Sequence, residues 1–422
     1  MEQLNFINMQ SSIRTMRRYF VSMLLIAIII ATYSCGGGNV DSVPRNEITA
    51  PLDSLFTSLF PAKDAPGAYV IVYSDDTLLY ARGFGLARLG DRQPMTDTTM
   101  MNICSATKTF VAAGIMKLIV ENGHLSLDQP ISDFFPQLNK DVFSRITIRN
   151  VFTHSTGLPD LRPSDEKEWL AYSAKYPNTQ FTHLDDYRLY ARGEEVTRFI
   201  EKLDTLAYEP GTRFEYLNPP YVLLANIIEN ATGVPFAKWL RKNVMEPAGI
   251  KDALFHPGGE PEWLAHGYRQ SSGTGTEKYY STSDGGWEEY DYGEAPFFAS
   301  SADNGLYITP REFRRWVNAL YSGKVISSAS LDTLNTVQIA THLSNLDIQY
   351  GLGLFIQTRP GMPKKVFHST SNGGFSIYEG GFPDRKLFYA IFANRADWNR
   401  LDVARKVDSI FESVGWIGPD QN

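Results

Sequence analysis

Residues 105–120 read SATKTFVAAGIMKLIV, and this stretch says most about the fold and the chemistry. Its apolar residues recur at helical spacing, which predicts a helix that ends near Asn122-Gly123. Ser105 and Lys108 stand three residues apart at its start, so both side chains lie on one face of the helix. The amine of Lys108 can therefore reach the hydroxyl of Ser105 and take its proton. A serine at a helix start also lies where backbone N–H groups favour developing negative charge.

A Ser-Xaa-Xaa-Lys tetrad is weak evidence by itself, because about one chance match is expected in a chain of this length. Ser164-Asp165-Glu166-Lys167 is a second match. Lys167 stands among acidic residues with which it can pair in water. Lys108 is an isolated polar group in an apolar helix, so it must find a partner or lose its charge. We therefore assign the nucleophile to Ser105.

Apolar, β-rich runs lie on both sides of this helix along the chain. Ala68–Tyr73 with Thr77–Ala81, and Phe375–Tyr378 with Leu387–Ala393, predict two hairpins. Helical spacing predicts further helices at residues 147–154, 196–203, 221–231, 236–244, 310–320 and 400–413.

This order predicts an α+β fold, with an antiparallel sheet built from both termini and flanked by helices, and an inserted, mainly helical subdomain. We expect one body over residues 51–420. Its sheet subdomain covers about 51–104 and 300–420, and its helical subdomain covers about 105–299. Residues 159–193 and 269–299 show no clear periodicity. They are either lids and binding loops or solvated surface excursions.

Composition excludes several classes of protein. The 422 residues are 43% hydrophobic and 21% charged, which is inconsistent with wholesale disorder, a collagen-like repeat or a coiled coil. Lys and Arg number 40 against 47 Asp and Glu, giving a net charge of 40 − 47 = −7. We expect no nucleic-acid partner, because such proteins usually carry a basic patch.

The N-terminus carries an export signal. Arg14, Arg17 and Arg18 precede an apolar run from Tyr19 to Ile30, which is too short to span a bilayer and is typical of a secretory signal peptide. An uncleaved membrane anchor is the alternative.

Cys35 is followed by three glycines, so the segment resembles a bacterial lipoprotein signal over residues 1–35. The resemblance implies lipidation of Cys35 and an exported, membrane-anchored, periplasm-facing protein. Residues 36–50 are expected to form a flexible tether. The only other cysteine is Cys104, so no metal or redox motif can be built from cysteines.

Two further elements supply groups for a serine nucleophile. Tyr216 and Asn218 stand two residues apart between a Pro-Gly turn and a predicted helix; Tyr176-Pro177-Asn178 has the same spacing but lies in an irregular stretch. The run His368-Ser369-Thr370-Ser371 follows a short apolar strand and can offer a backbone N–H and polar side chains. His368 alone is more simply a structural histidine.

These three elements occur in the order and spacing of the class C β-lactamase family, which includes D-alanyl-D-alanine carboxypeptidases, D-amino-acid peptidases and esterases. The resemblance covers about residues 51–415. It extends to four further blocks, Thr153–Pro159, Tyr208–Thr212, Glu246–Ile250 and Tyr350–Leu354.

The resemblance implies a β-lactamase/transpeptidase-like fold and a serine hydrolase that works through an acyl-enzyme. Its substrate would be a D-amino peptide, an ester or a β-lactam, with no metal or organic cofactor. The implied roles cover seven residues. Ser105 is the acylated nucleophile and Lys108 its proton acceptor or relay. Tyr216 is the base or proton shuttle, and Asn218 orients the substrate amide. The backbone N–H groups of Ser105 and Ser371 bind the oxyanion. His368 and Ser369 face the polar or carboxylate end of the substrate.

One position departs from the family pattern, since Thr370 stands where the family usually has Gly. Gly is used where another backbone or a ligand must come close. This departure disfavours β-lactam hydrolysis more than ester or peptide cleavage. It also leaves an alternative, a catalytically impaired lipoprotein that binds peptidoglycan fragments or a protein partner. A charged His368 would help to lower the pKa of Lys108 from its usual value near 10.4. His154 receives no role, because its turn looks structural.

Overall fold

A computed structural model describes the fold of the chain over residues 46–121, 123, 125–159, 197, 200–255, 264–271, 278–289 and 302–418. The predicted signal peptide, Cys35, the second tetrad at 164–167 and Tyr176 lie outside the described residues, as do residues 196, 198 and 199 of the predicted helix 196–203. Within the described part, no helix combines the length and apolar character needed to cross a membrane.

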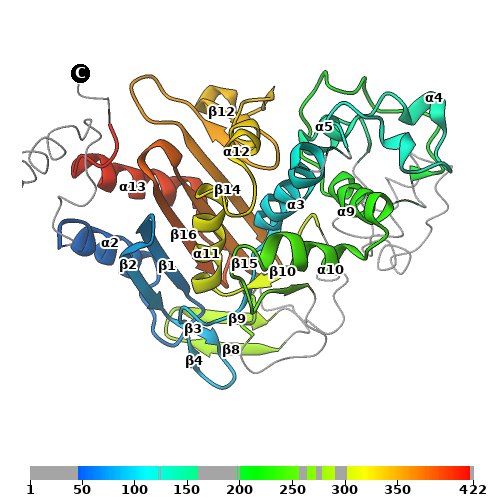
Figure 1. The fold of residues 1–422 in the computed structure, drawn as a ribbon. Helices are drawn as coiled ribbons and strands as arrows, with labels where there is room; N and C mark the ends of the chain where they lie inside the picture. Colours follow the sequence, from blue (N-terminus) through cyan, green and yellow to red (C-terminus); the bar gives the residue numbers. More distant parts are fainter. Residues whose placement is uncertain are drawn as a thin grey trace, which may run out of the picture. The chain divides into compact units, whose positions relative to one another are not determined.

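The main sheet has eight strands in the order β11-β12-β13-β14-β15-β16-β1-β2, and every neighbouring pair is antiparallel. In Figure 1 the blue N-terminal strands lie beside the orange C-terminal strands. This confirms the predicted sheet built from both termini. The strands are β1 (Ala68–Ser74), β2 (Thr77–Phe84), β11 (Ile339–Ala340), β12 (Ile348–Tyr350), β13 (Phe355–Gln357), β14 (Lys365–Asn372), β15 (Phe375–Phe382) and β16 (Leu387–Ala393).

Helices cover both faces of this sheet. Alternate residues of a strand point to opposite faces. On β16, Tyr389 packs on Phe411 of α13 (Arg400–Ser413), whereas Phe392 packs on Phe313 of α11 (Pro310–Tyr321). Helix α2 (Asn46–Leu59) lies beside α13. The predicted tether over residues 36–50 is therefore too long, because α2 begins at Asn46 and buries apolar side chains from its first turn onward.

The inserted region contains α3 (Thr107–Met116), which begins just after Ser105, and several further helices. These are α4 (Lys140–Phe143), α5 (Ile148–Phe152), α9 (Pro219–Thr232) and α10 (Phe236–Leu240), with α12 (Ser328–Leu334) further along the chain. Short 3-10 turns lie at 104–106, 131–133, 344–346 and 383–385, and α3 and α10 continue as π-helical turns at 117–121 and 241–245. Helix α9 packs against both α3 and α5.

The predicted helical subdomain over 105–299 is wrong in its last third. Strands β7 (Tyr268–Gln270), β9 (Gly285–Glu289) and β8 (Tyr279–Thr282) form a small antiparallel sheet there. A second small sheet joins β5 (Met101–Asn102), β10 (Leu306–Ile308) and β6 (Leu254–Phe255), and a hairpin joins β3 (Leu86–Arg88) to β4 (Gln93–Pro94). The first sheet forms because Tyr268 and Trp287 bury their rings in a cluster with residues of the β3 hairpin.

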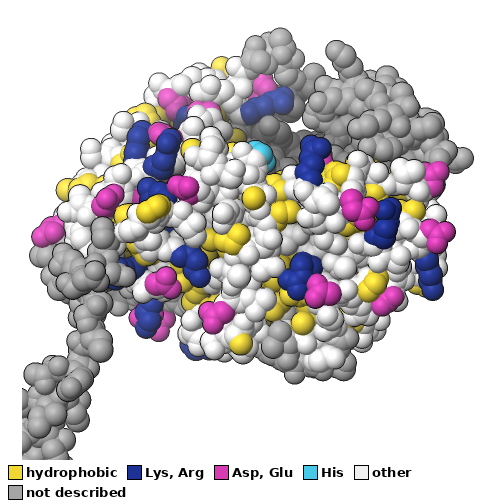
Figure 2. Space-filling model, turned by 90° about the horizontal axis from the view of Figure 1, so that it is seen from above, with side chains coloured by type: hydrophobic (Ala, Val, Ile, Leu, Met, Phe, Trp, Pro, Cys, Tyr) yellow, Lys and Arg dark blue, Asp and Glu magenta, His cyan; other side chains and the backbone are white. Residues whose placement is uncertain are grey.

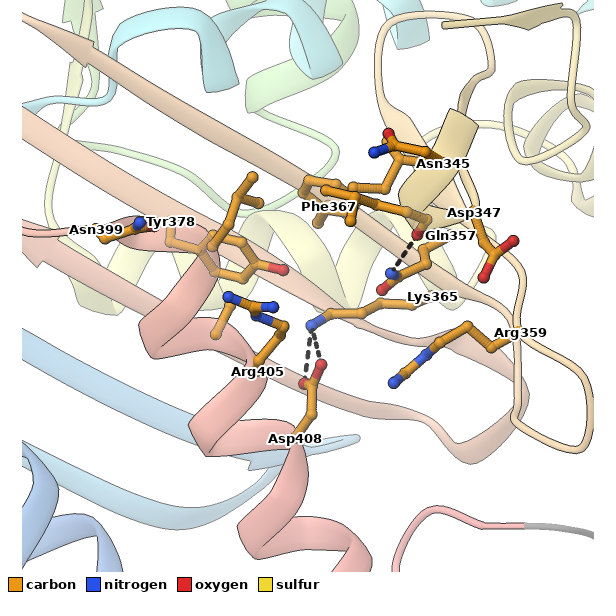
Figure 3. A pocket seen from close by; sticks show the side chains of 14 residues that line it. Asn345, Asp347, Gln357, Arg359, Lys365, Phe367, Tyr378, Asn399, Arg405 and Asp408 are labelled. Atoms are coloured by element: carbon orange, nitrogen blue, oxygen red, sulfur yellow. Dashed lines mark hydrogen bonds and ion pairs between the residues drawn. The ribbon is translucent and has the colours of Figure 1, made fainter. Parts of the chain in front are cut away.

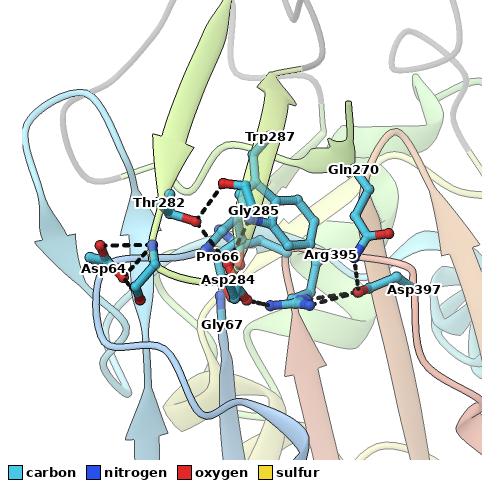
Figure 4. A network of polar contacts seen from close by, with 12 residues as sticks. Asp64, Pro66, Gly67, Gln270, Thr282, Asp284, Gly285, Trp287, Arg395 and Asp397 are labelled. Carbon is cyan, nitrogen blue, oxygen red and sulfur yellow. Dashed lines mark hydrogen bonds and ion pairs between the residues drawn. The ribbon is translucent and has the colours of Figure 1, made fainter. Parts of the chain in front are cut away.

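Arg395 ties the β7-β9-β8 sheet to the end of β16 (Figure 4). Its guanidinium contacts Asp284 at 2.8 Å and Asp397 at 2.6 Å, and it lies 4.2 Å from the ring of Trp287. Arg395 is buried, so its two carboxylate partners offset much of the cost of removing the charge from water.

A second buried ion pair lies on the α13 face of the main sheet. Lys365 donates to Asp408 at 2.6 and 2.8 Å and to the Tyr389 hydroxyl at 2.9 Å. Burial lowers the pKa of Lys365, and the Asp408 carboxylate opposes that shift. Figure 3 shows the pair beside a cavity of about 520 Å³ between β13, β14 and α13.

The surface carries charges of both signs. On the face drawn in Figure 2, basic and acidic side chains are interspersed over the described surface. Several form exposed pairs, such as Arg82 with Asp53 at 2.7 Å and Arg311 with Asp97 at 2.7 Å. Exposed pairs of this kind contribute little to stability.

Candidate active site

Ser105, the predicted nucleophile, lies in a strained turn between β5 and α3. A 3-10 turn over Cys104–Ala106 precedes α3. Cys104 has a left-handed backbone (φ 51°), which is uncommon for a residue with a side chain. The N–H of Cys104 donates to the Asn102 side-chain oxygen at 2.7 Å and holds this conformation. Such strain persists only where surrounding structure enforces it, and it is concentrated at functional sites.

Pairing between β5 and β10 brings a distant segment to this turn. Tyr307 and Ile308 pair with Asn102 and Met101, and the Ile103 N–H donates to the Leu306 carbonyl at 2.9 Å. The residues just before β10 therefore lie beside the first turn of α3. Ala302, in this segment, also has a left-handed backbone (φ 87°).

The structure brings Lys108 together with Ser105 inside the protein. Lys108 is fully buried, and its Nζ lies 2.9 Å from Ser105 Oγ, 2.8 Å from Asn218 Oδ1 and 2.6 Å from the Asp303 carbonyl oxygen. As an ammonium, Lys108 donates to these three oxygens. As a neutral amine it has two N–H donors and one lone pair. Asn218 and Asp303 can then accept the two N–H groups, which leaves the lone pair for the proton of Ser105.

Tyr216 lies close to the amine of Lys108. Its ring centre is 5.1 Å from Lys108 Nζ, and the ring of Tyr221, at the start of α9, is 5.2 Å from the same atom. Two aromatic faces therefore flank a cation, an arrangement that is favourable when water is excluded. The side-chain oxygen of Asn218 accepts a hydrogen bond from Lys108. The amide NH₂ group of Asn218 can then donate a hydrogen bond to a substrate carbonyl.

His154 holds the Tyr216 segment in place, a role that the sequence analysis missed. The His154 carbonyl accepts from Glu215 N at 2.8 Å, and Nδ1 accepts from Leu217 N at 3.2 Å. With Nδ1 accepting, the proton of the neutral ring is on Nε2, which lies 3.2 Å from the Tyr350 hydroxyl. The His154 ring stacks on Tyr216 with centroids 4.1 Å apart. Burial, and then the nearby Lys108 charge, hold the pKa of His154 well below its usual value, so the ring is neutral.

His368 also lies beside Tyr216, in an edge-to-face arrangement. Its ring is buried, with centroids 6.4 Å from Tyr216 and 5.7 Å from Phe355. Burial, followed by repulsion from Lys108, lowers the pKa of His368 to about 3. The hypothesis that a charged His368 helps Lys108 to lose its proton is therefore wrong, because His368 is itself neutral at neutral pH. Among the described residues neither ring nitrogen has a hydrogen-bond partner.

The four residues of the His368–Ser371 run alternate between the two faces of β14. His368 and Thr370 point toward α3, and the Thr370 hydroxyl accepts from the Ser105 N–H at 3.0 Å. Ser369 points the other way, where its hydroxyl accepts from Arg400 Nε at 3.1 Å. The structure therefore does not bring the His368 and Ser369 side chains together. Ser371 is exposed one residue beyond Thr370.

Two of the groups around Lys108 had no signal in the sequence. The Asp303 contact uses a backbone carbonyl, which any residue type supplies. The role of His154 depends on the segment that packs over it. Its left-handed backbone (φ 52°) is a feature of the folded chain and is not visible in the residue pattern.

Comparisons with known proteins agree with this geometry. A family model described as Beta-lactamase matches residues 52–409. The chain is 25% identical over 349 residues to penicillin-binding protein 4* of Bacillus subtilis, covering 82% of this chain and 72% of that protein. It is 30% identical over 233 residues to esterase EstB of Burkholderia gladioli, covering 54% and 56% respectively.

Solved structures give the same fold. An octameric penicillin-binding protein homologue from Pyrococcus abyssi matches with a TM-score of 0.68 and 25% identity, over 88% of this chain and 78% of that one. A D-amino acid amidase from Ochrobactrum anthropi matches with a TM-score of 0.66 and 23% identity, over 87% of this chain and 97% of that one. With a Ser-Xaa-Xaa-Lys pair at hydrogen-bond distance, in an α+β fold of this type, the chain belongs to the β-lactamase family of serine hydrolases.

Proposed function

We propose that this protein hydrolyses an ester or a D-amino peptide through an acyl-enzyme on Ser105. The observation that carries the proposal is the 2.9 Å contact between Lys108 Nζ and Ser105 Oγ inside a buried site. Esterases and D-aminopeptidases are among the relatives. Their names, together with the intact Ser105–Lys108 contact, give no support to a catalytically impaired binding lipoprotein.

In the proposed first half-reaction, Ser105 Oγ forms a bond to the substrate carbonyl carbon as its proton passes to Lys108. The carbonyl π electrons move to oxygen, and backbone N–H groups of Ser105 and Ser371 stabilise the resulting oxyanion. Tyr216, close to Lys108, then relays the proton to the leaving alkoxide or amine as the carbonyl re-forms. Water attacks the acyl-enzyme by the reverse route and releases the acid.

The neutral ring of His368 favours a substrate whose group beside this residue is uncharged over one that carries a carboxylate there. A lysine there would attract a carboxylate, whereas an imidazole with its pKa lowered to about 3 is neutral at neutral pH. Its two ring nitrogens can still donate one hydrogen bond and accept another. We therefore rank esters and D-amino peptides that have no free carboxylate at this end ahead of β-lactams, whose recognition commonly includes a carboxylate.

Active-site labelling tests the nucleophile. We expect a fluorophosphonate probe to label the purified protein on the peptide that contains Ser105. The label should vanish in Ser105→Ala and persist in Ser164→Ala, a matched control that removes the serine of the second tetrad. A probe that labels neither the wild type nor Ser164→Ala would refute the acyl-enzyme. Turnover of p-nitrophenyl esters, D-alanyl peptides and a chromogenic cephalosporin then ranks the substrates.

We also propose that the chain is exported and anchored to a membrane by lipid on Cys35. The basic, apolar and Cys-Gly-Gly-Gly pattern of residues 14–38 supports this. Metabolic labelling with an alkyne fatty acid should mark the wild type in a membrane fraction. A Cys35→Ala variant should lose the mark and the membrane association. Equal labelling of both proteins would contradict the proposal.

A further inference from the structure

We propose that Thr370 is a specificity-determining residue. In the free enzyme the Thr370 hydroxyl accepts the hydrogen bond of the Ser105 N–H, and a substrate acylates Ser105 only when its carbonyl oxygen displaces that hydroxyl. This inference rests on the proposed function, in which the Ser105 N–H binds the oxyanion. It predicts a preference for flexible, acyclic esters and amides over rigid fused β-lactams.

The contact is direct and shielded from water. Ser105 N donates to Thr370 Oγ1 at 3.0 Å, within the usual range for such hydrogen bonds, and both residues are buried. Thr370 pairs with Ile377 across β14 and β15, so its backbone is held by the centre of the main sheet. A backbone N–H has one hydrogen, so the Thr370 hydroxyl and a substrate oxygen compete for it.

The competition changes along the reaction. A hydroxyl and a neutral carbonyl are comparable hydrogen-bond acceptors. Before the reaction starts, the Thr370 hydroxyl therefore competes with the substrate carbonyl for the Ser105 N–H and weakens substrate binding. A charged oxyanion forms hydrogen bonds about twice as strong as those of a neutral acceptor. Displacement therefore becomes favourable as the tetrahedral intermediate forms.

The displaced hydroxyl has a partner within reach. His368 stands two residues before Thr370 on the same face of β14, about 7 Å away along the strand. Its ring nitrogens are buried, and no residue in the described ranges hydrogen-bonds to them. A Thr370 side chain that rotates away from Ser105 can therefore point its hydroxyl toward the His368 ring.

Rotation of Thr370 needs space beside the scissile carbonyl. Its Cβ carries a methyl and a hydroxyl, so a rotation about the Cα–Cβ bond that moves the hydroxyl away from Ser105 also moves the methyl group to a new position. In an acyclic ester, the alkoxide and acyl parts turn about single bonds and can vacate that space. In a fused β-lactam, the ring holds the leaving nitrogen rigidly beside the carbonyl. Thr370 should therefore penalise β-lactams more than esters.

Three variants separate the hydrogen bond from the bulk. Thr370→Val keeps the shape and removes the acceptor, so we expect kcat/KM for p-nitrophenyl acetate to rise about threefold to tenfold, the contribution of one hydrogen bond. The rate with a chromogenic cephalosporin should stay low. Thr370→Gly removes acceptor and bulk, so both rates should rise and the ester-to-cephalosporin ratio should fall at least tenfold. Thr370→Ser removes the methyl group and keeps the hydroxyl, so the ester-to-cephalosporin ratio should fall by less than in Thr370→Gly. This variant also serves as the test if Thr370→Gly does not fold.

The outcomes distinguish this inference from the proposed function. If the fluorophosphonate labels Ser105 in the wild type while Thr370→Val, Thr370→Ser and Thr370→Gly leave both rates unchanged, the role of Thr370 is refuted and the acyl-enzyme stands. A fall in ester turnover in Thr370→Val also refutes it, because the hydroxyl would then assist the reaction. If no variant or wild type is labelled, both proposals fail.

Discussion

The His368→Phe substitution tests the electrostatics of the site through stability. The pKa of His368 falls from 6.5 to about 3 on folding, because the ring is buried and faces the charge on Lys108. As the pH drops below 6.5, the unfolded chain binds a proton at this position while the folded protein does not. Protonation therefore stabilises the unfolded state, and the free energy of unfolding decreases with falling pH.

The size of the effect follows from the shift. Between the unfolded pKa of 6.5 and pH 5.0 there are 1.5 pH units, each worth about 1.4 kcal/mol, so His368 accounts for a loss of about 2 kcal/mol. Phenylalanine has a similar shape and suits the aromatic contacts with Tyr216 and Phe355, but it does not titrate. His368→Phe should therefore lose about 2 kcal/mol less stability than the wild type over this interval.

Urea unfolding followed by tryptophan fluorescence at pH 7.5 and pH 5.0 measures this difference. His342→Phe is the matched control, because it makes the same substitution at an exposed histidine. Titrating groups remote from His368 contribute alike to each protein and cancel in the comparison. The pKa of His154 is lowered chiefly by burial and by the Lys108 charge, and only after these by His368, so it stays low in both proteins. Equal losses in the wild type and in His368→Phe would refute the reasoning, because His368 would then take up its proton in the folded protein.

Three other substitutions test separate parts of the structure. Lys108→Met should slow fluorophosphonate labelling by about 100- to 10,000-fold, because no amine remains to take the Ser105 proton. The control Lys117→Met, in the π-helical turn that follows α3, should be labelled at the wild-type rate. His154→Phe keeps the stack on Tyr216 but loses the bonds that position its segment, so kcat for an ester should fall about 10- to 100-fold; an unchanged kcat would show that Tyr216 needs no such support. Arg395→Met leaves two carboxylates without their cation and should lower the free energy of unfolding by about 3 kcal/mol in urea titrations, while the labelling rate of the folded protein stays the same. A slower labelling rate with unchanged stability would contradict that assignment.

Local patterns predicted the elements that carry the site. The three-residue spacing of Ser105 and Lys108 is a property of one helical turn, and the structure places their side chains 2.9 Å apart. The two predicted hairpins appear as β1-β2 and β15-β16, because their apolar runs and turns lie close together in the chain. The small β7-β9-β8 sheet was missed, since its strands are short and rich in polar residues, and only its packing against the β3 hairpin buries Tyr268 and Trp287.

The remaining features depend on segments that meet only in the folded chain. Asp303 lies 195 residues from Lys108 and contributes a main-chain oxygen. Thr370 lies 265 residues from Ser105, whose N–H donates to its hydroxyl. The residue pattern showed a departure from Gly at this position but not the hydrogen bond. The neutral state of His368 likewise depends on burial and on the distance to the Lys108 charge.

The sequence by itself determined the family, the two hairpins of the main sheet, and the spacing that brings Ser105 and Lys108 together, because these depend on residue types and on spacings within a few residues. Only the tertiary structure decided which oxygens surround Lys108, which imidazoles are neutral and which group holds the Ser105 N–H. Those properties depend on the packing of strands and helices that are far apart in the chain, and on the exclusion of water that results from it.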